Sequence, residues 1–378
     1  MSSSPLPVTL LTGGTGFLGS YIGAELVNRG AKVVFPVRDK NKISAAGRLE
    51  RILKWHGLDG REKNAVPWAG WEPEKFPFGI DRVVYCMSDT SFSERNREQV
   101  WTTNVEQLER LTERVIRNGI TRFVYISTAY AAGNRKGPCP EEPVNNGSFH
   151  NVYEESKAAA ENMLIEKCRT AGIGLTIVRP SIVYGHSRNG RTLKFNALYY
   201  PVKTALFLAR VYREDILEKG GEKAAEAGVF LDPDGRLHLP LRIETGDDPG
   251  VNLIPVDFFI RALFAIMESD NPEGIFHIVN PQPTRINDII RYTRNMFNLA
   301  GIRGCGPEDF VKSPRNSLEN LYERYLQAYL PYFRDHRTFL TGKSTPLLET
   351  RGITCPDFNE NIFRICMSYA EKSNWQSP

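Results

Sequence analysis

The sequence has little of what builds small domains held by disulfides or metals. Its 378 residues include only six cysteines, and no two of them form a CxxC pair. Disulfide scaffolds and zinc ribbons cluster their cysteines, so both classes are excluded. We expect the cysteines to be reduced structural thiols, and we expect no metal site.

An excess of either charge is also missing. Lys and Arg number 48 and Asp and Glu number 44, so the formal net charge is +4, and no dense basic run is present. Nucleic acid is therefore not indicated as a partner. Hydrophobic residues make up 41% and charged residues 24%, which is ordinary for a globular protein and argues against disorder or a coiled coil.

Long hydrophobic runs are absent as well. The N-terminal segment, MSSSPLPVTLLTGG, has no basic region before its apolar stretch, so we expect no signal peptide. The most apolar later stretch, residues 197–211, contains Lys203 and is shorter than the roughly 20 residues that cross a bilayer. We therefore expect no transmembrane segment and a cytoplasmic protein.

Strand and helix patterns alternate through the first half of the chain. We predict strands at 8–11, 32–37, 82–86, 122–127 and 175–179, and helices ending near Asn28 and covering 94–117 and 152–170. Each crossover between parallel strands must return over the sheet, so helices cover both faces. The strands are nearly continuous apolar runs, as doubly buried strands are.

A glycine-rich loop joins the first strand to the first helix. Gly13, Gly16 and Gly19 allow a tight turn, a close approach of the backbone to a pyrophosphate, and close packing of helix on strand. The helix start offers free amide donors to phosphates. The loop predicts a dinucleotide site that also includes Thr15, Phe17 and Leu18. The alternative is a purely structural turn.

These signals predict an α/β fold with a Rossmann-type doubly wound parallel sheet. Beyond Tyr184 the pattern changes, with a strand at 252–256, a helix at 257–267, a strand at 275–279 and helical pieces after 286. We expect residues 1–185 to form the dinucleotide-binding domain, completed by about 251–282. Residues 186–250 and 283–378 then form a smaller, mostly helical substrate-binding region.

Arg38 follows the second predicted strand, where a dinucleotide fold meets the adenosine ribose. An acidic residue there suits the 2′-hydroxyl of NAD, whereas Arg accommodates the 2′-phosphate of NADP. Arg38, with Lys40 or Lys42 as helpers, favours NADP(H). Asp39 keeps NAD open, because a shift of one residue would bring its carboxylate to the ribose.

Tyr153 and Lys157 lie one turn apart on the predicted helix 152–170. A nearby ammonium is expected to lower the pKa of a phenol and to make it a usable acid or base. Ser127 and Thr128 end a neighbouring strand, where a hydroxyl can hold a carbonyl oxygen against the tyrosine. The alternative is an ordinary surface pair of Tyr and Lys.

Four motifs together resemble the extended short-chain dehydrogenase/reductase family over about residues 8–300. They are TGGTGFLG at 12–19, STAYAAG at 127–133, YEESK at 153–157 and RPSIVYG at 179–185. The resemblance implies that Tyr153 is the catalytic acid or base and that Lys157 is its partner and a ligand of the nicotinamide ribose. It implies Thr128 as the catalytic hydroxyl, with the adjacent Ser127 as the alternative.

The same resemblance implies further cofactor contacts. Asn104 matches a family asparagine on the helix beneath the site, and Pro180 and Ser181 match the segment beside the nicotinamide. Two segments depart from the family pattern. Gly70-Trp71-Glu72 stands where a Gly-Asp pair usually meets the adenine, and Cys86-Met87-Ser88 replaces a small-residue run, with Cys86 as the expected contact.

Within the family, several phrases resemble the fatty acyl-CoA reductases and the thioester reductase domains. They are NLIPVDFFIRALFAIM at 252–267 and GIFHIVNPQPTRINDII at 274–290. YLPYFRDHRTFLTGKSTPLL at 329–348 and SYAEKSNW at 368–375 weakly resemble the C-terminal region of alcohol-forming reductases, or form a generic helical cap. Residues 197–211 are interpreted first as a core helix. An acyl tunnel, a homodimer helix and contact with a membrane surface stay open.

The resemblance implies an NADP-dependent reductase of an acyl thioester, or of an aldehyde or ketone, that transfers hydride with a tyrosine as proton donor. A nucleotide-sugar epimerase or dehydratase with tightly bound NAD is the alternative, because it shares the scaffold and the catalytic residues. A non-enzymatic dinucleotide-binding regulator is a third interpretation. The retained Thr128, Tyr153 and Lys157 argue against it.

Overall fold

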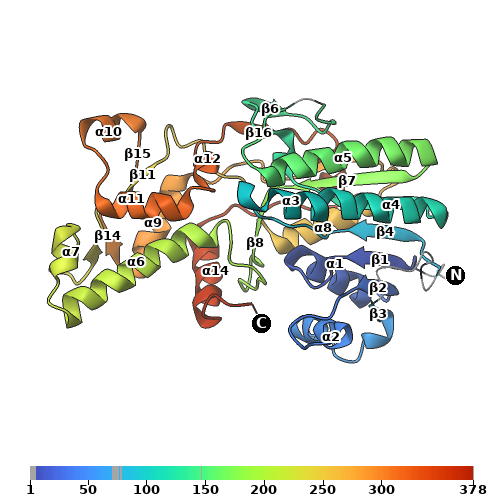
Figure 1. Cartoon of the computed structure of the whole chain (residues 1–378), viewed down its shortest axis with the longest axis horizontal. Coiled ribbons are helices and arrows are strands. Elements are labelled where there is room, and N and C mark those ends of the chain that lie inside the picture. Colours follow the sequence, from blue (N-terminus) through green and yellow to red (C-terminus); the bar gives the residue numbers. More distant parts are fainter. Residues whose placement is uncertain (1–5, 70–75, 77–78, 146, 378) are drawn as a thin grey trace.

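A computed structural model describes residues 6–69, 76, 79–145 and 147–377, and its centre is a seven-stranded parallel sheet (Figure 1). The strand order is β13-β7-β5-β4-β1-β2-β3. The strands are β1 (Thr9–Thr12), β2 (Val33–Pro36), β3 (Ala65–Trp68), β4 (Arg82–Tyr85), β5 (Arg122–Ile126), β7 (Gly174–Pro180) and β13 (Gly274–Ile278). The predicted doubly wound α/β fold is confirmed.

Helices cover both faces of this sheet. Successive strand side chains point to opposite faces, so Leu11 and Leu10 pack into two different cores. One face carries α1 (Phe17–Asn28), α2 (Ala45–Trp55) and α8 (Val256–Met267). The other carries α4 (Gln107–Arg117) and α5 (Val152–Ala171).

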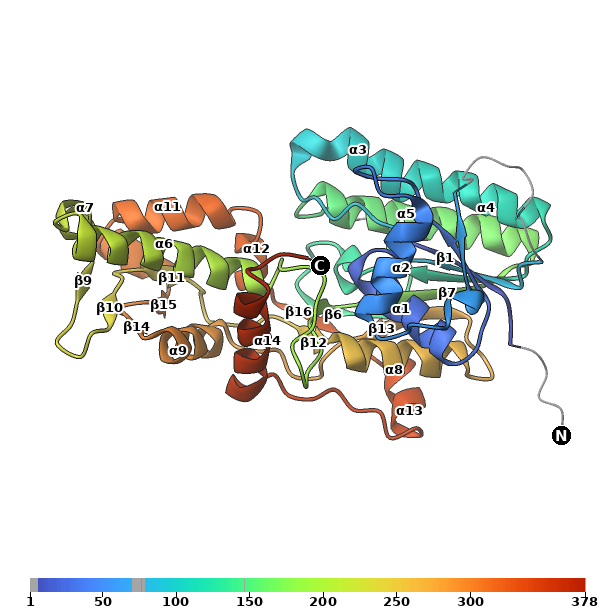
Figure 2. The ribbon, with the colours of Figure 1, turned by 90° about the horizontal axis from the view of Figure 1, so that it is seen from below.

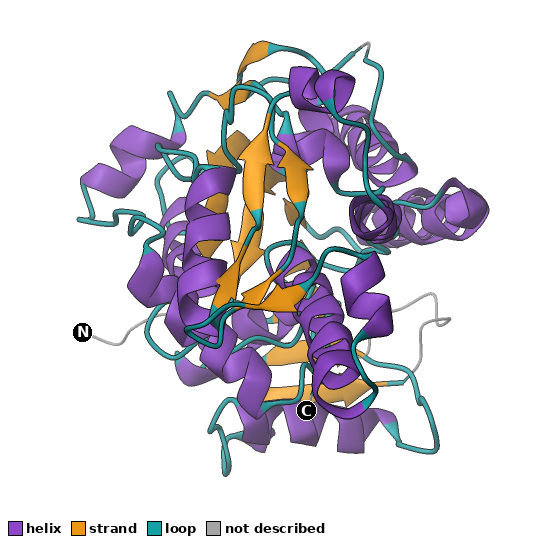
Figure 3. Ribbon diagram, turned by 90° about the vertical axis from the view of Figure 1, so that its left-hand side faces the viewer, coloured by secondary structure: helices purple, strands orange, loops and turns teal. Residues whose placement is uncertain are grey.

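A second, mostly helical part lies to one side of the sheet domain and has its own apolar core (Figure 2). Its helices are α6 (Tyr199–Glu218), α7 (Glu222–Glu226), α9 (Ile286–Phe297), α10 (Pro307–Lys312), α11 (Ser317–Leu326) and α14 (Glu360–Lys372). Figure 3, with this part toward the viewer, shows short strands among them. These are β9 (Phe230–Leu231), β10 (Leu237–His238), β11 (Arg242–Glu244), β14 (Leu299–Ala300) and β15 (Arg303–Cys305).

Two pairs of short parallel strands lie outside the main sheet. β8 (Ile182–Tyr184) pairs with β12 (Leu253–Pro255), and β6 (Gly137–Cys139) pairs with β16 (Arg337–Phe339). The second pair brings the chain back from the distal helices through α12 (Leu330–Phe333). The chain then continues along the sheet domain to α13 (Ser344–Glu349), which packs on α8.

The predicted helix 94–117 is interrupted, because a π-helical segment (Thr102–Glu106) separates α3 (Arg97–Trp101) from α4 and a 3₁₀ turn (Glu94–Asn96) precedes it. Two more 3₁₀ turns lie at Glu62–Asn64 and Ala129–Ala132. Strand β7 runs through Pro180 rather than ending before it, because β13 pairs with it to the end. Within the described ranges, every helix is too short or too polar to traverse a bilayer.

Candidate active site

One cavity of about 510 Å³ runs from the glycine loop to the distal helices. It opens at the carboxyl ends of β1, β4 and β5, where parallel α/β sheets bind ligands. Nearly all of the predicted site residues line it. These are Gly13, Thr15, Gly16, Phe17, Leu18, Gly19, Arg38, Cys86, Ser127, Thr128, Tyr153, Lys157, Pro180 and Ser181.

The glycine loop is held in a shape that only glycine tolerates at two positions. Gly13 has a φ of +69°, and a Cβ there would lie 2.8 Å from the backbone of Cys86. A Cβ on Gly19 would collide with the carbonyl oxygen of Gly13. The loop can therefore pack tightly under the start of α1, whose first amides lack partners within the helix and face the cavity entrance.

Two arginines meet at the end of the cavity beside the glycine loop. Arg48 donates from Nη1 to the carbonyl oxygen of Arg38 across 2.5 Å and from Nη2 to Thr15 Oγ1 across 3.1 Å. Both Arg38 and Arg48 line the cavity. The carboxylate of Asp39 instead accepts from the backbone N–H of Ala45 across 2.7 Å at the start of α2. This arrangement gathers positive charge beside the loop.

Two predicted residues lie elsewhere. Lys42 is exposed and does not line the cavity that the described residues form. Asn104 is buried in the π-helical segment and is also absent from that lining. Its amide donates to Ser156 Oγ and its carbonyl accepts from the N–H of Asp89 across 2.7 Å. Asn104 therefore joins α5 to the loop after β4.

The catalytic candidates meet at the middle of the cavity. Thr128 and Tyr153 both line the cavity there, and the side chain of Thr128 acts to lower the pKa of Tyr153. Lys157 is buried, and its Nζ donates to the carbonyl oxygen of Ile126 across 2.7 Å and lies 4.2 Å from the ring centroid of Tyr125. Ser127 Oγ is buried and has no hydrogen-bond partner among the described residues. Thr128 is thus the hydroxyl that faces the phenol.

Burial has the largest effect on the pKa values of Tyr153 and Lys157. It raises the pKa of Tyr153, and the side chain of Thr128 lowers that pKa only in part. Burial also lowers the pKa of Lys157 to about 8. The expectation that the Lys157 ammonium lowers the pKa of the phenol is wrong for this arrangement. The ammonium is bound to Ile126, and desolvation is the larger effect.

The distal half of the cavity is apolar. Tyr322, Tyr329, Tyr332 and Phe333 line it together with residues of two helices and of short strands and loops, among them Ile243, Leu253 and Ile302. The helix-derived lining residues are Leu198, Pro201, Val202 and Ala205 around the start of α6 and Ile286, Ile289, Ile290 and Thr293 on α9. The stretch 197–211 therefore serves as both core helix and cavity wall. Its outer face exposes Phe207 by 54% and Val211 by 42%.

The residues present fit a dinucleotide. The loop glycines leave room at the helix start, and the two arginines supply cations beside the glycine loop. Ser181 Oγ, at the opposite end of the predicted cofactor cleft, is buried with no partner among the described residues. A buried hydroxyl of this kind calls for a polar ligand group. The segment Gly70-Trp71-Glu72 lies outside the described residues.

Residues 11–263 match the NAD-binding family described as Male sterility protein. The chain belongs to this family. The match confirms the resemblance to the extended short-chain dehydrogenase/reductase family that the motifs indicated.

Single proteins resemble this chain at low sequence identity. The uncharacterized protein y4nG of Sinorhizobium fredii is 29% identical over 182 residues, which are 48% of this chain and 42% of that protein. The chain spans about half, or less, of the curated relatives it matches.

Two solved structures show that the fold is shared. The terminal R domain of the myxalamid PKS-NRPS pathway superposes with a TM-score of 0.74 at 22% identity, covering 99% of this chain and 92% of that one. UDP-glucuronic acid 4-epimerase of Bacillus cereus, in complex with NAD, superposes with a TM-score of 0.61 at 16% identity, covering 97% and 99%.

Some functional residues were not predicted from the sequence. Arg48 lies on α2, a helix that was not predicted, and it reaches Thr15 through a contact between segments far apart in the sequence. Thr90, Phe92 and Lys194 also line the cavity. Their loops carry no motif. Two local signals could have placed α2 and hence Arg48: the N-cap Ser44, which accepts from Gly47 N, and the buried apolar residues Ala45, Leu49 and Leu53 at intervals of four.

Proposed function

We propose that this protein reduces an acyl thioester, or the corresponding aldehyde, with NADP(H) as cofactor. The observation that carries the proposal is the continuity of one cavity. It joins the glycine loop, the Thr128–Tyr153 pair and an apolar chamber between α6 and α9. The glycine loop suits the cofactor, the Thr128–Tyr153 pair suits the reacting carbonyl, and the apolar chamber suits the acyl chain.

The chamber suits an unbranched chain. Its lining runs from Leu198 to Ala205 beside α6 and from Ile286 to Thr293 on α9. Each stretch spans about two helical turns, or about 10 Å. Burying an acyl methylene stabilises a complex by about 0.8 kcal/mol, so chain length contributes strongly to affinity until the chamber ends.

The chemistry assigned to the chain's own residues is proton transfer and orientation. Thr128 and Tyr153 donate hydrogen bonds to the substrate carbonyl oxygen, on which negative charge develops. Tyr153 then gives its proton to that oxygen, which yields an alcohol from an aldehyde and a hemithioacetal from a thioester. The hemithioacetal breaks its carbon–sulfur bond, the hydroxyl proton passes to the leaving sulfur, and aldehyde and free thiol are formed. A bound nicotinamide supplies the hydride for the carbonyl carbon. With a pKa of about 8, Lys157 is mostly protonated at neutral pH and so offers a cation to a ribose hydroxyl.

Several groups are proposed to hold the cofactor. The loop amides around Gly16 and the start of α1 suit the pyrophosphate, and Ser181 suits the nicotinamide amide. Arg38 and Arg48 suit a 2′-phosphate, whereas Asp39 is engaged with Ala45 N. This engagement supports NADP over NAD. A cytoplasmic location and a homodimer stay predictions.

A nucleotide-sugar epimerase is the second candidate. It is favoured by the structural likeness to UDP-glucuronic acid 4-epimerase, which carries NAD in its crystals. The aliphatic chamber counts against it, because a sugar needs many polar partners and the walls at Val202, Ala205 and Ile290 offer none from their side chains.

One experiment separates the two candidates. The purified protein is given NADPH with acyl-CoA thioesters of increasing length and, separately, NAD with UDP-glucose or UDP-glucuronic acid. We expect NADPH consumption with release of free CoA, and exchangeable cofactor on purification. Epimerisation of the sugars with tightly retained NAD, and no oxidation of NADPH by any thioester, would overturn the proposal.

A further inference from the structure

Residues 329–339 connect the distal part to the catalytic helix, and we call this segment the strap. It contains α12 and β16, which lie between the distal helices and α5 (Figures 1 and 2). Parallel pairing with β6 sets its register, with Arg337 opposite Gly137 and Phe339 opposite Cys139. The strap therefore arrives beside α5 in a fixed alignment.

The strap places Arg337 and Tyr332 around one buried carboxylate, that of Glu154. The side chains of Arg337 and Glu154 are 1% and 0% exposed and approach to 3.3 Å. Tyr332 donates its hydroxyl proton to Glu154 Oε1 across 2.8 Å and accepts from Asn151 Nδ2 across 2.8 Å. Arg337 also donates to the carbonyl oxygen of Gly133 across 2.8 Å. Glu154 directly follows Tyr153.

Aromatic packing gives a second link to the same tyrosine. The ring of Phe92 lies 5.9 Å from the ring of Tyr153 and is stacked on Tyr332 at 5.6 Å. Tyr329 of the strap packs against Phe92 at 5.6 Å. Phe92 is therefore held between Tyr153 and two strap residues.

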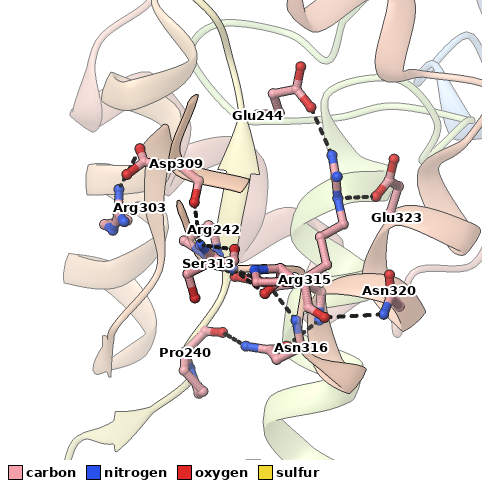
Figure 4. A network of polar contacts seen from close by, with 12 residues as sticks. Pro240, Arg242, Glu244, Arg303, Asp309, Ser313, Arg315, Asn316, Asn320 and Glu323 are labelled. Atoms are coloured by element: carbon pink, nitrogen blue, oxygen red, sulfur yellow. Dashed lines mark hydrogen bonds and ion pairs between the residues drawn. The ribbon is translucent and has the colours of Figure 1, made fainter. Parts of the chain in front are cut away.

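The strap also holds the distal part. Arg334 pairs with Glu244 at 3.0 Å, and His336 pairs with Asp247 at 3.3 Å. Figure 4 shows Glu244 bound to Arg315 within the polar network of the distal helices. The strap thus contacts both Glu244 and Asp247 in the distal part and Glu154 on α5.

We propose that Arg337 and Tyr332 are positioning residues for the reduction proposed above, holding Glu154 and Phe92 so that Tyr153 stays against Thr128. The inference rests on that proposed function. Arg337 does not line the cavity as the described residues form it, so it acts through Glu154 and not by touching substrate.

The charges around Tyr153 and Glu154 make the pH dependence of kcat a test of this positioning role. Around Tyr153 the titratable groups are Cys86, Glu154 and Lys157, and around Glu154 they are Arg337, Asp335, Tyr130 and Tyr332. His150 contacts Glu154 through its backbone N–H. An anion beside the phenol disfavours the phenolate. Arg337 binds Asp335 at 2.7 Å and lies 3.3 Å from Glu154, so both carboxylates share this cation. Removal of Arg337 therefore leaves the buried carboxylate of Glu154, next to Tyr153, without its cation, and Asp335 as well.

The test compares Arg337→Gln with the pair Arg337→Gln/Glu154→Gln. The measurements are kcat and its pH profile, the Kd of NADPH, and amide hydrogen exchange at the first turn of α5. Arg242→Gln is the matched control, because Arg242 makes a comparable bridge with Glu319 at 2.7 Å in the distal part. It should lower stability without moving the pH profile.

We expect Arg337→Gln to lower kcat by about 10-fold or more, to shift the alkaline limb of kcat upward, and to leave NADPH affinity within about 2-fold. Hydrogen exchange at 152–157 should quicken. The paired variant should recover kcat to within about 3-fold of the parent. A kcat near that of the parent in Arg337→Gln, or no recovery in the pair, overturns the inference.

A second variant and a second measurement cover the cases in which Arg337→Gln does not fold or the parent shows no turnover. If Arg337→Gln does not fold, Tyr332→Phe keeps the ring on Phe92 and removes the hydroxyl that donates to Glu154 and accepts from Asn151. It should show the same pH shift, and an unshifted profile overturns the inference. If the parent turns over no substrate, the proposed reduction fails. Hydrogen exchange then tests by itself whether the strap holds the first turn of α5. Unchanged exchange at 152–157 in Arg337→Gln would overturn the positioning role of Arg337.

Discussion

The guanidinium of Arg48 donates to Thr15 Oγ1 across 3.1 Å, which ties the first half of α2 to the glycine loop. The other arm of the same guanidinium holds the carbonyl oxygen of Arg38. Arg48 is thus both a cation beside the glycine loop and the contact that holds the backbone of Arg38.

This arrangement predicts the cofactor preference. Arg38→Ala should raise the KM for NADPH by roughly 10- to 100-fold, because charge-assisted hydrogen bonds contribute about 1.5–3 kcal/mol, and should leave the KM for NADH nearly unchanged. Steady-state kinetics with both cofactors measure this. Lys42→Ala is the control and should change neither value. Equal losses for NADPH and NADH in Arg38→Ala would contradict the assignment.

The apolar chamber predicts a limit on acyl length. Ala205 lines its wall about two turns along the stretch from Leu198. Ala205→Leu should reduce kcat/KM for long acyl-CoA substrates by about 10-fold or more and spare short ones, because added methylenes fill the far end. The measurement is kcat/KM across a series of chain lengths.

Ala209 provides the control for that prediction. It is buried on the same helix one turn later but is not part of the lining that the described residues form. Ala209→Leu carries a similar packing cost and should leave the length profile unchanged. A length profile that shifts equally in both variants would show that the chamber does not set the limit.

Acid should weaken the fold through His277. Burial beneath the end of the strap lowers the pKa of His277 to about 4, with Arg179 nearby adding to the effect. The unfolded state binds a proton near pH 6.5, so this contribution is present above pH 6.5 and is lost as the pH falls toward 4. The loss amounts to about 3 kcal/mol.

The measurement is denaturant unfolding of the parent and of His277→Asn between pH 7 and 4. The variant keeps a donor for the carbonyl oxygen of Leu340, which lies 2.7 Å from Nδ1. Its stability should fall less steeply with pH. His56, whose pKa burial also lowers to about 4, titrates in both proteins. Parallel curves for the two proteins would contradict the role of His277.

Much of the sheet domain follows from local patterns. Near-continuous apolar runs predicted six of the seven strands of the main sheet, and spacing alone placed Tyr153 and Lys157 on one face of α5. Edge strand β3 was not predicted, because its short sequence, Ala65–Trp68, includes a proline and an exposed face. Local sequence carries such information only where periodicity is strong.

The rest of the site depends on contacts between distant segments. Tyr332 meets Glu154 because β16 pairs with β6, and no motif near either residue announces that pairing. Asn104 was expected beside the cofactor, but the π-helical segment turns its amide to Ser156. The pKa of Tyr153 likewise follows from its burial, which spacing does not reveal.

The measurement that tests the account most directly is NADPH oxidation by the parent and by Tyr153→Phe with a saturating acyl-CoA. We expect Tyr153→Phe to lose about 100-fold or more in kcat, because the proton donor is removed. Its Kd for NADPH should stay within about 2-fold of that of the parent. A variant that keeps most of its turnover would contradict the assignment of Tyr153 and, with it, the proposed mechanism.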